Sequence, residues 1–273
     1  MPGPVGHRRR RHDADLRLGV TTPAGPDAPG YSHAVPATDS SHGDLAARLA
    51  AAQARVAAAA RAVDRDPSEV RLLLASKRMP AAVVREAVLA GGTLLGENTV
   101  QELAAKAPEL ADLGAELHLI GHLQSNKVNA ALRWADCVQS VDTLALAERL
   151  ARRCETTDRE LDVMVQVNVS GEASKDGVDP EGATDLALAV AALPRLRLTG
   201  LMTIGANTDD EALVRVGFGR LRAIRDAVRA SGAPGTSTAR ELSMGMSGDL
   251  ELAVAEGATM VRIGTAVFGA RTS

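Results

Sequence analysis

The chain contains very few aromatic residues: two phenylalanines, one tyrosine and one tryptophan among 273 residues. Its core must therefore be aliphatic, and we do not expect the stacking platforms of single-strand nucleic-acid-binding proteins. The net charge of −3 also lacks the basic excess that is typical of nucleic-acid-binding domains. Both observations argue against a nucleic-acid partner.

Cysteines and long apolar segments are scarce as well. Cys137 and Cys154 are the only cysteines, and their spacing fits no metal site. We therefore expect two free thiols in a reducing compartment, the cytoplasm. No apolar run approaches the roughly 18 residues that a membrane span needs, so we expect no membrane partner. An apolar fraction of 45% is typical of a globular protein, and we predict a monomer.

Residues 1–42 differ from the rest of the chain in composition. They are rich in Pro, Gly, Ser and His, show no periodicity and contain the run Arg8-Arg9-Arg10-Arg11. This composition predicts a disordered tail. No apolar core follows the arginine run, so it does not match an export signal. We interpret the segment as a dispensable or misassigned start, with weak attraction to an acidic partner as the alternative.

Residues 43–273 predict a single folded domain. Cap-type residues precede an apolar helical stripe that begins at Leu45 and ends before Asp66-Pro67. Apolar runs typical of buried parallel strands then alternate with helical segments. We expect strands near residues 70–75, 93–96, 116–121, 137–141, 161–169, 196–204, 239–243 and 259–264. We expect helices near residues 80–90, 98–107, 124–133, 143–155, 180–192, 209–230 and 247–256. Eight strands predict a (β/α)8 TIM barrel after one extra helix, because an open doubly wound sheet usually has fewer strands.

Lys77 is the first candidate for chemistry. It follows the first predicted strand, Val70–Ala75, and Pro80 then opens a helix. Barrels of this type bind ligands at the carboxyl ends of their strands. A partly desolvated lysine there has a lowered pKa and can form a Schiff base. From this segment alone, a surface lysine in a loop is the more economical interpretation.

Two segments after the last predicted strands are typical of a phosphate site. Ser243–Ser247 is a turn of small residues that leads into a predicted helix, so its N–H groups would favour an anion. Gly264-Thr265 offers close backbone approach and a hydroxyl group. Phosphate sites in such barrels often use the loops after the last two strands. Either glycine alone is explained by a tight turn, but the two together favour a phosphate.

Arg262 lies inside the apolar strand 260–264. A buried guanidinium without a partner is costly, so it either forms a structural ion pair or donates to a ligand. With Lys77 and a phosphate site, it implies a phosphorylated carbonyl compound. The candidates are the substrate of a sugar-phosphate aldolase and pyridoxal 5′-phosphate (PLP) held as a Schiff base. Because an arginine can donate to the pyridine nitrogen and keep it unprotonated, Arg262 favours PLP.

The motifs of this sequence resemble those of the pyridoxal phosphate homeostasis protein family (the YggS/PROSC type). The resemblance extends in one register from about residue 43 to the end, and it is carried by residues 70–80, 96–102, 118–127, 243–247 and 260–271. It implies a fold-type III barrel similar to the N-terminal domain of alanine racemase. It also implies a role in vitamin B6 homeostasis, in which PLP is stored and delivered, with transient contact with apo PLP enzymes as a possibility.

The resemblance also implies roles for individual residues. Lys77 would form the Schiff base, Arg262 would contact the pyridine nitrogen, and Asn98 would lie beside the cofactor. The phosphate would be held by residues of the two final loops, Ser243, Met244, Ser247, Gly264 and Thr265. Thr99 departs from the family pattern, in which an aromatic residue is commoner, so the pocket wall at this position is open to question.

A PLP-dependent amino-acid racemase or decarboxylase is the alternative function. A two-base racemase needs an acid/base group opposite the lysine, which is a tyrosine in alanine racemase. The only tyrosine here is Tyr31, in the predicted tail. His118, His122 and Cys137 are possible substitutes, but each is expected to be structural. We therefore predict a PLP carrier without catalytic turnover.

Two further lysines, Lys127 and Lys175, also follow predicted strands. We expect them to be surface charges. A secondary landing site for the cofactor at either lysine is the alternative.

Overall fold

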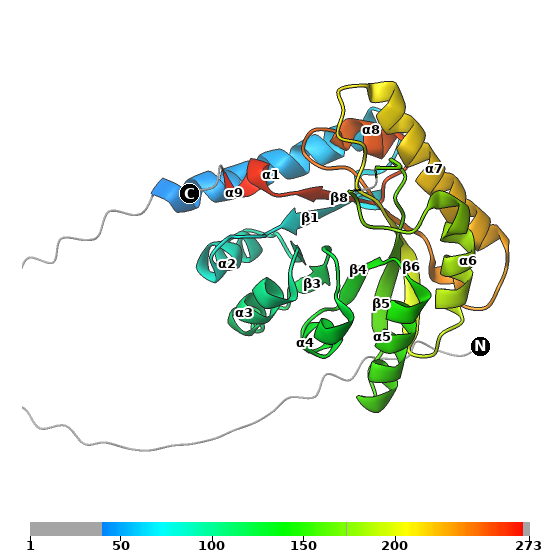
Figure 1. Ribbon diagram of the computed structural model, residues 1–273. Coiled ribbons are helices and arrows are strands. Elements are labelled where there is room, and N and C mark those ends of the chain that lie inside the picture. The colour runs from blue at the N-terminus through cyan, green and yellow to red at the C-terminus, as the bar shows by residue number, and fades with distance from the viewer. Residues whose placement is uncertain (1–39, 173, 270–273) are drawn as a thin grey trace, which may run out of the picture. The chain divides into compact units, whose positions relative to one another are not determined.

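Eight parallel strands form a closed barrel in the computed structural model, which describes residues 40–172 and 174–269 (Figure 1). Each strand pairs with its neighbour in sequence, and β8 pairs with β1. This architecture confirms the predicted (β/α)8 barrel. The strands are β1 (Arg71–Ala75), β2 (Leu94–Glu97), β3 (Glu116–Leu119), β4 (Cys137–Val141), β5 (Leu161–Gln166), β6 (Leu196–Met202), β7 (Glu241–Ser243) and β8 (Met260–Ile263).

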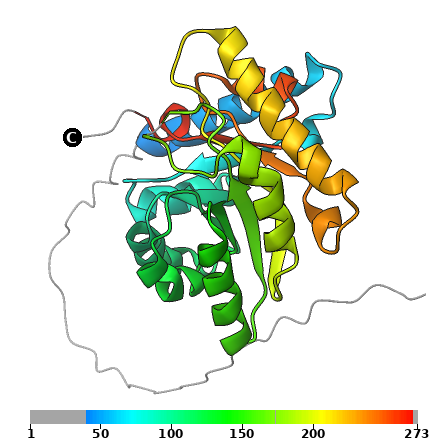
Figure 2. The same cartoon turned by 45° about the vertical axis from the view of Figure 1, so that its right-hand side comes forward.

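Helices follow the strands and surround the barrel, as Figures 1 and 2 show for α6 and α7, which lie side by side. They are α1 (Ser40–Arg61), α2 (Ala81–Leu89), α3 (Val100–Leu110), α4 (Val128–Leu132), α5 (Leu144–Thr156), α6 (Pro180–Ala191), α7 (Glu211–Ala230), α8 (Leu250–Ala255) and α9 (Thr265–Phe268).

Two helical predictions need correction, and one helix was not predicted. The segment 124–133 is divided into a 3-10 turn, Ser125–Lys127, and the short helix α4. The helix expected at residue 247 begins only at Leu250, because residues 247–249 form a turn. The short helix α9 was not expected.

The inside of the barrel is lined mainly by aliphatic and sulfur-containing side chains. Buried residues from six strands form this inner cluster: Leu73, Leu94, Cys137, Met164, Met202 and Met260. A larger aliphatic cluster lies between the strands and the helices. The scarcity of aromatic residues is therefore met by leucine, valine and methionine in both layers.

Helix α1 packs against α8, α9 and α2 on the outside of the barrel (Figure 1). Its buried stripe includes Leu45, Leu49 and Val56, as the helical spacing predicted. Polar contacts hold it to the end of the chain: Arg55 forms a two-bond ion pair with Glu251 of α8, and Arg48 Nε donates to the Val267 carbonyl of α9. The first helix thus supports the elements around the last two strands.

The predicted tail, with its Arg8–Arg11 run and Tyr31, lies outside the described residues except for residues 40–42, where α1 begins. Within the part that the structure describes, no helix has the length and hydropathy needed to cross a membrane.

Candidate functional site

Lys77 lies in a tight turn directly after β1. The Met79 N–H donates to the Ser76 carbonyl, and Arg78 has a φ of 63°, which is uncommon for a residue other than glycine. The Arg78 N–H is held by the Glu102 carboxylate of α3. The turn therefore has a fixed conformation, and the Lys77 side chain is exposed at its tip.

A buried polar cluster fixes the residue before Lys77. The Ser76 hydroxyl donates to Glu97 Oε1 (2.6 Å), and Lys106 Nζ donates both to Glu97 Oε1 (2.8 Å) and to the Ser76 carbonyl (2.7 Å). Burial raises the pKa of Glu97, against the opposing effect of hydrogen bonds from Lys106 and Ser76. Glu97 Oε2 is buried without a partner among the described residues. Sequence analysis assigned no role to Glu97 or Lys106.

Lys77 shares a small open pocket with the end of β8. The pocket is lined by Lys77 and Met79 from the first strand–helix connection, by Ala75 of β1, and by residues 264, 265, 268 and 269 at and around α9. A Cβ at Gly264 would lie 2.9 Å from the Ala75 carbonyl oxygen, so only glycine allows this approach. Lys77, Gly264 and Thr265, predicted from separate segments, therefore lie together.

Arg262 is buried, with 5% of its surface exposed, and burial lowers its pKa to about 10, although Asp249 has the opposite effect. Its Nη1 donates to Ser243 Oγ (2.9 Å), and its Nη2 donates to the Thr203 carbonyl (2.6 Å). Both partners are neutral. No ion pair of Arg262 is found within residues 40–172 and 174–269, which disfavours the structural ion pair considered from the sequence. Its remaining N–H donors are available for a ligand.

Ser243 belongs to a chain of hydrogen bonds inside the barrel. Its hydroxyl donates to Gln139 Oε1 (2.6 Å), and Gln139 Nε2 lies 2.6 Å from His118 Nδ1. His118 Nε2 in turn lies 2.7 Å from Glu116 Oε1. The hydroxyl hydrogen of Ser243 is thus used within the protein, which leaves it no hydrogen for a phosphate. Sequence analysis missed Gln139, although a lone amide in the body of a barrel strand is a recognisable signal.

The turn after β7 offers fewer free N–H groups than the sequence suggested. Met244 is completely buried and its N–H donates to the Met260 carbonyl, while the Met246 N–H donates to Asp249. The N–H groups of Gly245 and Ser247 make no hydrogen bond within the described residues. The contribution of a following helix is smaller than predicted, because α8 begins at residue 250 and has only six residues.

Asn98 lies at the end of β2 and is partly exposed. Its carbonyl oxygen would lie 2.0 Å from a Cβ at Gly121, so the loop after β3 approaches it closely. Thr99, where the family commonly has an aromatic residue, caps α3: its Oγ1 accepts a hydrogen bond from the Glu102 N–H (3.2 Å). The departure at Thr99 therefore has a local structural role.

The other candidates from the sequence have different surroundings. Lys175 Nζ donates to Glu172 Oε1 (2.6 Å) and to the Gly205 carbonyl (2.7 Å), so its amine is engaged. The Lys127 side chain has no hydrogen bond within the described chain and is partly exposed. His122 is exposed near Asp142 and Asp176.

Cys137 and His118 lie inside the barrel rather than at its mouth. Cys137 is buried, and burial raises the pKa of its thiol. Cys137 and Cys154 are free thiols. No group of three or more potential metal ligands was found in residues 40–172 and 174–269.

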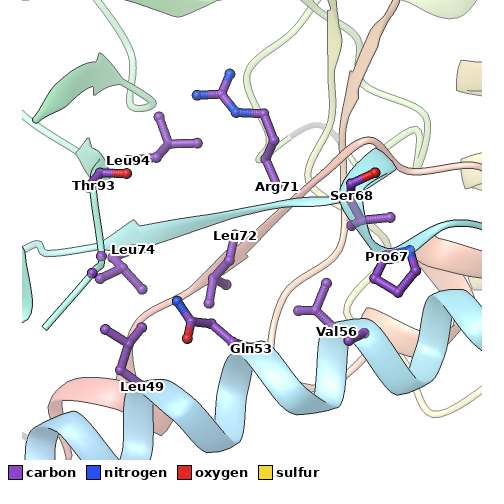
Figure 3. A pocket seen from close by; sticks show the side chains of 14 residues that line it. Leu49, Gln53, Val56, Pro67, Ser68, Arg71, Leu72, Leu74, Thr93 and Leu94 are labelled. Atoms are coloured by element: carbon purple, nitrogen blue, oxygen red, sulfur yellow. The ribbon is translucent and has the colours of Figure 1, made fainter.

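A separate cavity of about 440 Å³ lies between α1 and the beginning of β1 and β2. Figure 3 shows Leu72 and Leu74 of β1 facing Leu49 and Val56 of α1, with Gln53 between them. Its walls combine aliphatic and polar residues, and its Arg71 is paired with Glu116. It lies along β1 on the side of α1, Lys77 is not part of its lining, and it lacks a cluster of reactive groups.

The residues around the Lys77 pocket fit a phosphorylated aldehyde with a ring acceptor. The pocket itself supplies the amine of Lys77 and the turn at Thr265. The Arg262 guanidinium and the N–H groups of Gly245 and Ser247 do not line this pocket, but they offer further donors on β8 and after β7. The guanidinium of Arg262 is buried with two neutral hydrogen-bond partners and without an ion pair among the described residues, and this is the feature that most favours an acceptor from a ligand.

Comparisons with known proteins identify the family of the chain. Residues 47–272 match the model of the family described as alanine racemase, N-terminal domain. The pyridoxal phosphate homeostasis protein of Pseudomonas aeruginosa is 48% identical over 227 residues, which cover 83% of this chain and 96% of that protein. The protein of the same name from Escherichia coli K12 is 42% identical over 231 residues, 84% and 97% of the two chains.

A solved structure is also similar to this chain. PipY of Synechococcus elongatus PCC7942, solved with PLP bound, has a TM-score of 0.71 and 37% identity, and the match covers 82% of this chain and 100% of that one. The chain belongs to the family of pyridoxal phosphate homeostasis proteins, which share the fold of the alanine racemase N-terminal domain.

Proposed function

We propose that this protein binds PLP covalently at Lys77 and holds it for vitamin B6 homeostasis and delivery. The observation that most supports this proposal is the pocket that Lys77 shares with Gly264 and Thr265. A lysine amine beside a glycine turn and a threonine hydroxyl suits an aldehyde that bears a phosphate. The names of the relatives and the PLP in the PipY structure support the same ligand.

The residues at and near the pocket have different roles in PLP binding. Lys77 forms the Schiff base with the aldehyde carbon, and Arg262 donates to the pyridine nitrogen. Thr265, with the free N–H groups of its own turn and of Gly245 and Ser247, binds the phosphate. Ser243 and Met244 have a supporting role, because the Ser243 hydroxyl donates to Gln139 and the Met244 N–H donates to the Met260 carbonyl. Gly264 permits the close approach, and Asn98 lies beside the ring.

The proposed role involves no catalytic turnover. A racemase or decarboxylase needs a positioned acid or base at the cofactor. His118 and Cys137 are buried inside the barrel, and His122 is paired loosely with two aspartates. An arginine at the pyridine nitrogen also makes the ring a weaker electron sink than a carboxylate would. A carrier therefore fits these residues better than an enzyme.

The cellular setting is part of the proposal. Residues 43–273 act as one PLP-binding domain, and the protein works as a monomer that transiently contacts apo PLP enzymes. The two unpaired, buried thiols suit a reducing compartment, which favours the cytoplasm.

An absorbance spectrum of the purified protein incubated with PLP tests the proposal. We expect the yellow colour of a Schiff base, and reduction with borohydride followed by peptide mapping should place the label on Lys77. Lys77→Ala should remove the colour. Lys127→Ala, a matched change at another strand end, should retain it. A label on Lys127 or Lys175, or a Lys77→Ala protein that is still yellow, would refute the assignment.

The two alternatives have their own signatures. A sugar-phosphate aldolase would cleave its substrate without the yellow chromophore. A racemase or decarboxylase would turn over a common amino acid at steady state when loaded with PLP. Either result would show that the protein is an enzyme and would refute the carrier function.

A further inference from the structure

The buried hydrogen-bond chain that begins at Arg262 crosses the barrel. It links Arg262 of β8 to Ser243 of β7, then to Gln139 of β4, and then to His118 and Glu116 of β3. Ser243, Gln139 and His118 are each at most 2% exposed. The carboxylate at the far end also accepts a hydrogen bond from Arg71 of β1. Five strands thus contribute to one connected network.

Each end of this chain has only one role in a hydrogen bond. An arginine only donates, so Ser243 Oγ accepts from Arg262. A carboxylate only accepts, so His118 Nε2 carries the hydrogen that points to Glu116. Hydrogen bonding from His118 is the main reason why the pKa of Glu116 is lowered to about 2, which keeps it an acceptor.

The middle of the chain follows from the amide orientation of Gln139. Its amide nitrogen faces His118 Nδ1, which accepts the hydrogen, while His118 Nε2 donates to Glu116. The Gln139 amide oxygen then faces Ser243 and accepts its hydroxyl hydrogen. Ser243 therefore presents only its lone pair to Arg262. Each side chain has one compatible orientation, which makes the network well suited to positioning a side chain.

We propose that Gln139 and His118 are positioning residues. Through Ser243 they hold Arg262 in the orientation in which its guanidinium donates to the pyridine nitrogen. This inference rests on the proposed PLP function and extends it to two residues that do not touch the ligand. Without the amide oxygen of Gln139, the Ser243 hydroxyl rotates, and its hydrogen can point at Arg262, where it repels the guanidinium. The network then no longer favours a single guanidinium orientation.

Gln139→Met tests this role, because methionine has a similar length but no amide. We expect the affinity for PLP, measured by absorbance titration of the full chain, to fall about tenfold, the effect of one hydrogen bond that is lost from Arg262. His118→Leu removes the next link, and we expect a loss of about threefold. If Gln139→Met does not fold, the PLP affinity of His118→Leu tests the proposal instead. Thermal unfolding of each apo variant reports the structural cost separately.

A matched control is Gln166→Met. Gln166 is a buried glutamine of β5 whose amide donates to the Asp176 carbonyl and which is not part of the chain. We expect its PLP affinity to stay within twofold of the unchanged protein. An equal loss in Gln139→Met and Gln166→Met would show a general effect of removing a buried amide and would overturn the proposal.

A double-mutant cycle with Arg262→Ala gives the sharper result. Arg262→Ala alone should weaken PLP binding about 10- to 100-fold, as expected for one hydrogen bond to a charged donor. If Gln139 acts through Arg262, adding Gln139→Met to Arg262→Ala causes no further loss. A further tenfold loss in the double variant would show independent action and refute the positioning role. A protein that binds no PLP before any substitution would instead refute the proposed function itself.

Discussion

Removing Lys106 should destabilise the protein in a pH-dependent way. Lys106→Met deletes the two hydrogen bonds from Nζ, to Glu97 and to the Ser76 carbonyl, and leaves a buried carboxylate with the Ser76 hydroxyl as its partner. The side chains of Lys106 and Glu97 are only 8% and 4% exposed. Breaking such a buried pair typically costs about 3–5 kcal/mol.

Proton uptake by Glu97 limits that cost. Protonating a carboxyl group whose unfolded pKa is 4.5 costs about 1.4 kcal/mol per pH unit above that value, or about 3.4 kcal/mol at pH 7. We therefore expect Lys106→Met to lose about 3 kcal/mol at pH 7, which lowers the melting temperature by about 6–12 °C.

The pH dependence follows from the raised pKa of Glu97. Between 4.5 and the folded-state pKa, the folded protein binds more protons than the unfolded chain, so its stability falls as the pH rises. Loss of Lys106 raises that pKa further and widens this range. The difference between the variant and the unchanged protein should therefore shrink to about 1 kcal/mol as the pH approaches 4.5.

Denaturant unfolding at several pH values measures this effect. Lys127→Met is a suitable control, because the Lys127 side chain has no hydrogen bond within the described residues. The stability of this variant should change by less than about 0.5 kcal/mol. A Lys106→Met protein that loses less than about 1 kcal/mol at pH 7, or loses the same amount at every pH, would refute the reasoning.

Two further predictions concern other parts of the barrel. Gly121→Ala should destabilise the protein by about 2–3 kcal/mol in denaturant unfolding, because its Cβ would lie 2.0 Å from the Asn98 carbonyl oxygen, whereas Gly248→Ala, which meets no atom within 4 Å, should be nearly neutral. Equal stability of the two variants would contradict the close approach. Glu116→Gln should flatten the acid limb of the stability profile: the lowered pKa of Glu116 contributes stability above 4.5 that is lost as the pH falls toward about 2, and the amide does not titrate. An unchanged acid limb in Glu116→Gln would show that another carboxylate dominates this range.

The barrel was predictable from the sequence because each buried strand is a short apolar run between helical segments. The ends of elements were less predictable, since they depend on local capping. Helix α3 continues to Leu110 through Pro108, although a proline usually ends a helix, and residues 247–249 form a turn before α8. Both differences arise from backbone geometry that residue type alone does not determine.

The candidate site was predictable where one residue type determines the chemistry. Lys77, Gly264 and Thr265 were found because strand ends converge in a barrel, and the structure brings them to one pocket. Gln139 and Lys106 were missed because their importance depends on partners from distant segments: Gln139 bonds to Ser243, 104 residues away. Such pairs are visible only once the strands are in register.

The packing of α1 has a consequence for how the chain is made. This helix emerges from the ribosome before any strand, yet Arg55 pairs with Glu251, 196 residues later, and its apolar stripe packs on α8 and α9. During synthesis α2 and β1 can cover part of the stripe early, but the part that packs on α8 and α9 stays uncovered until nearly the whole chain is available, which exposes it to proteases and to aggregation. Protection of the contacts between α1 and these two helices should therefore be among the last events of folding, and C-terminally shortened nascent chains should depend most on chaperones.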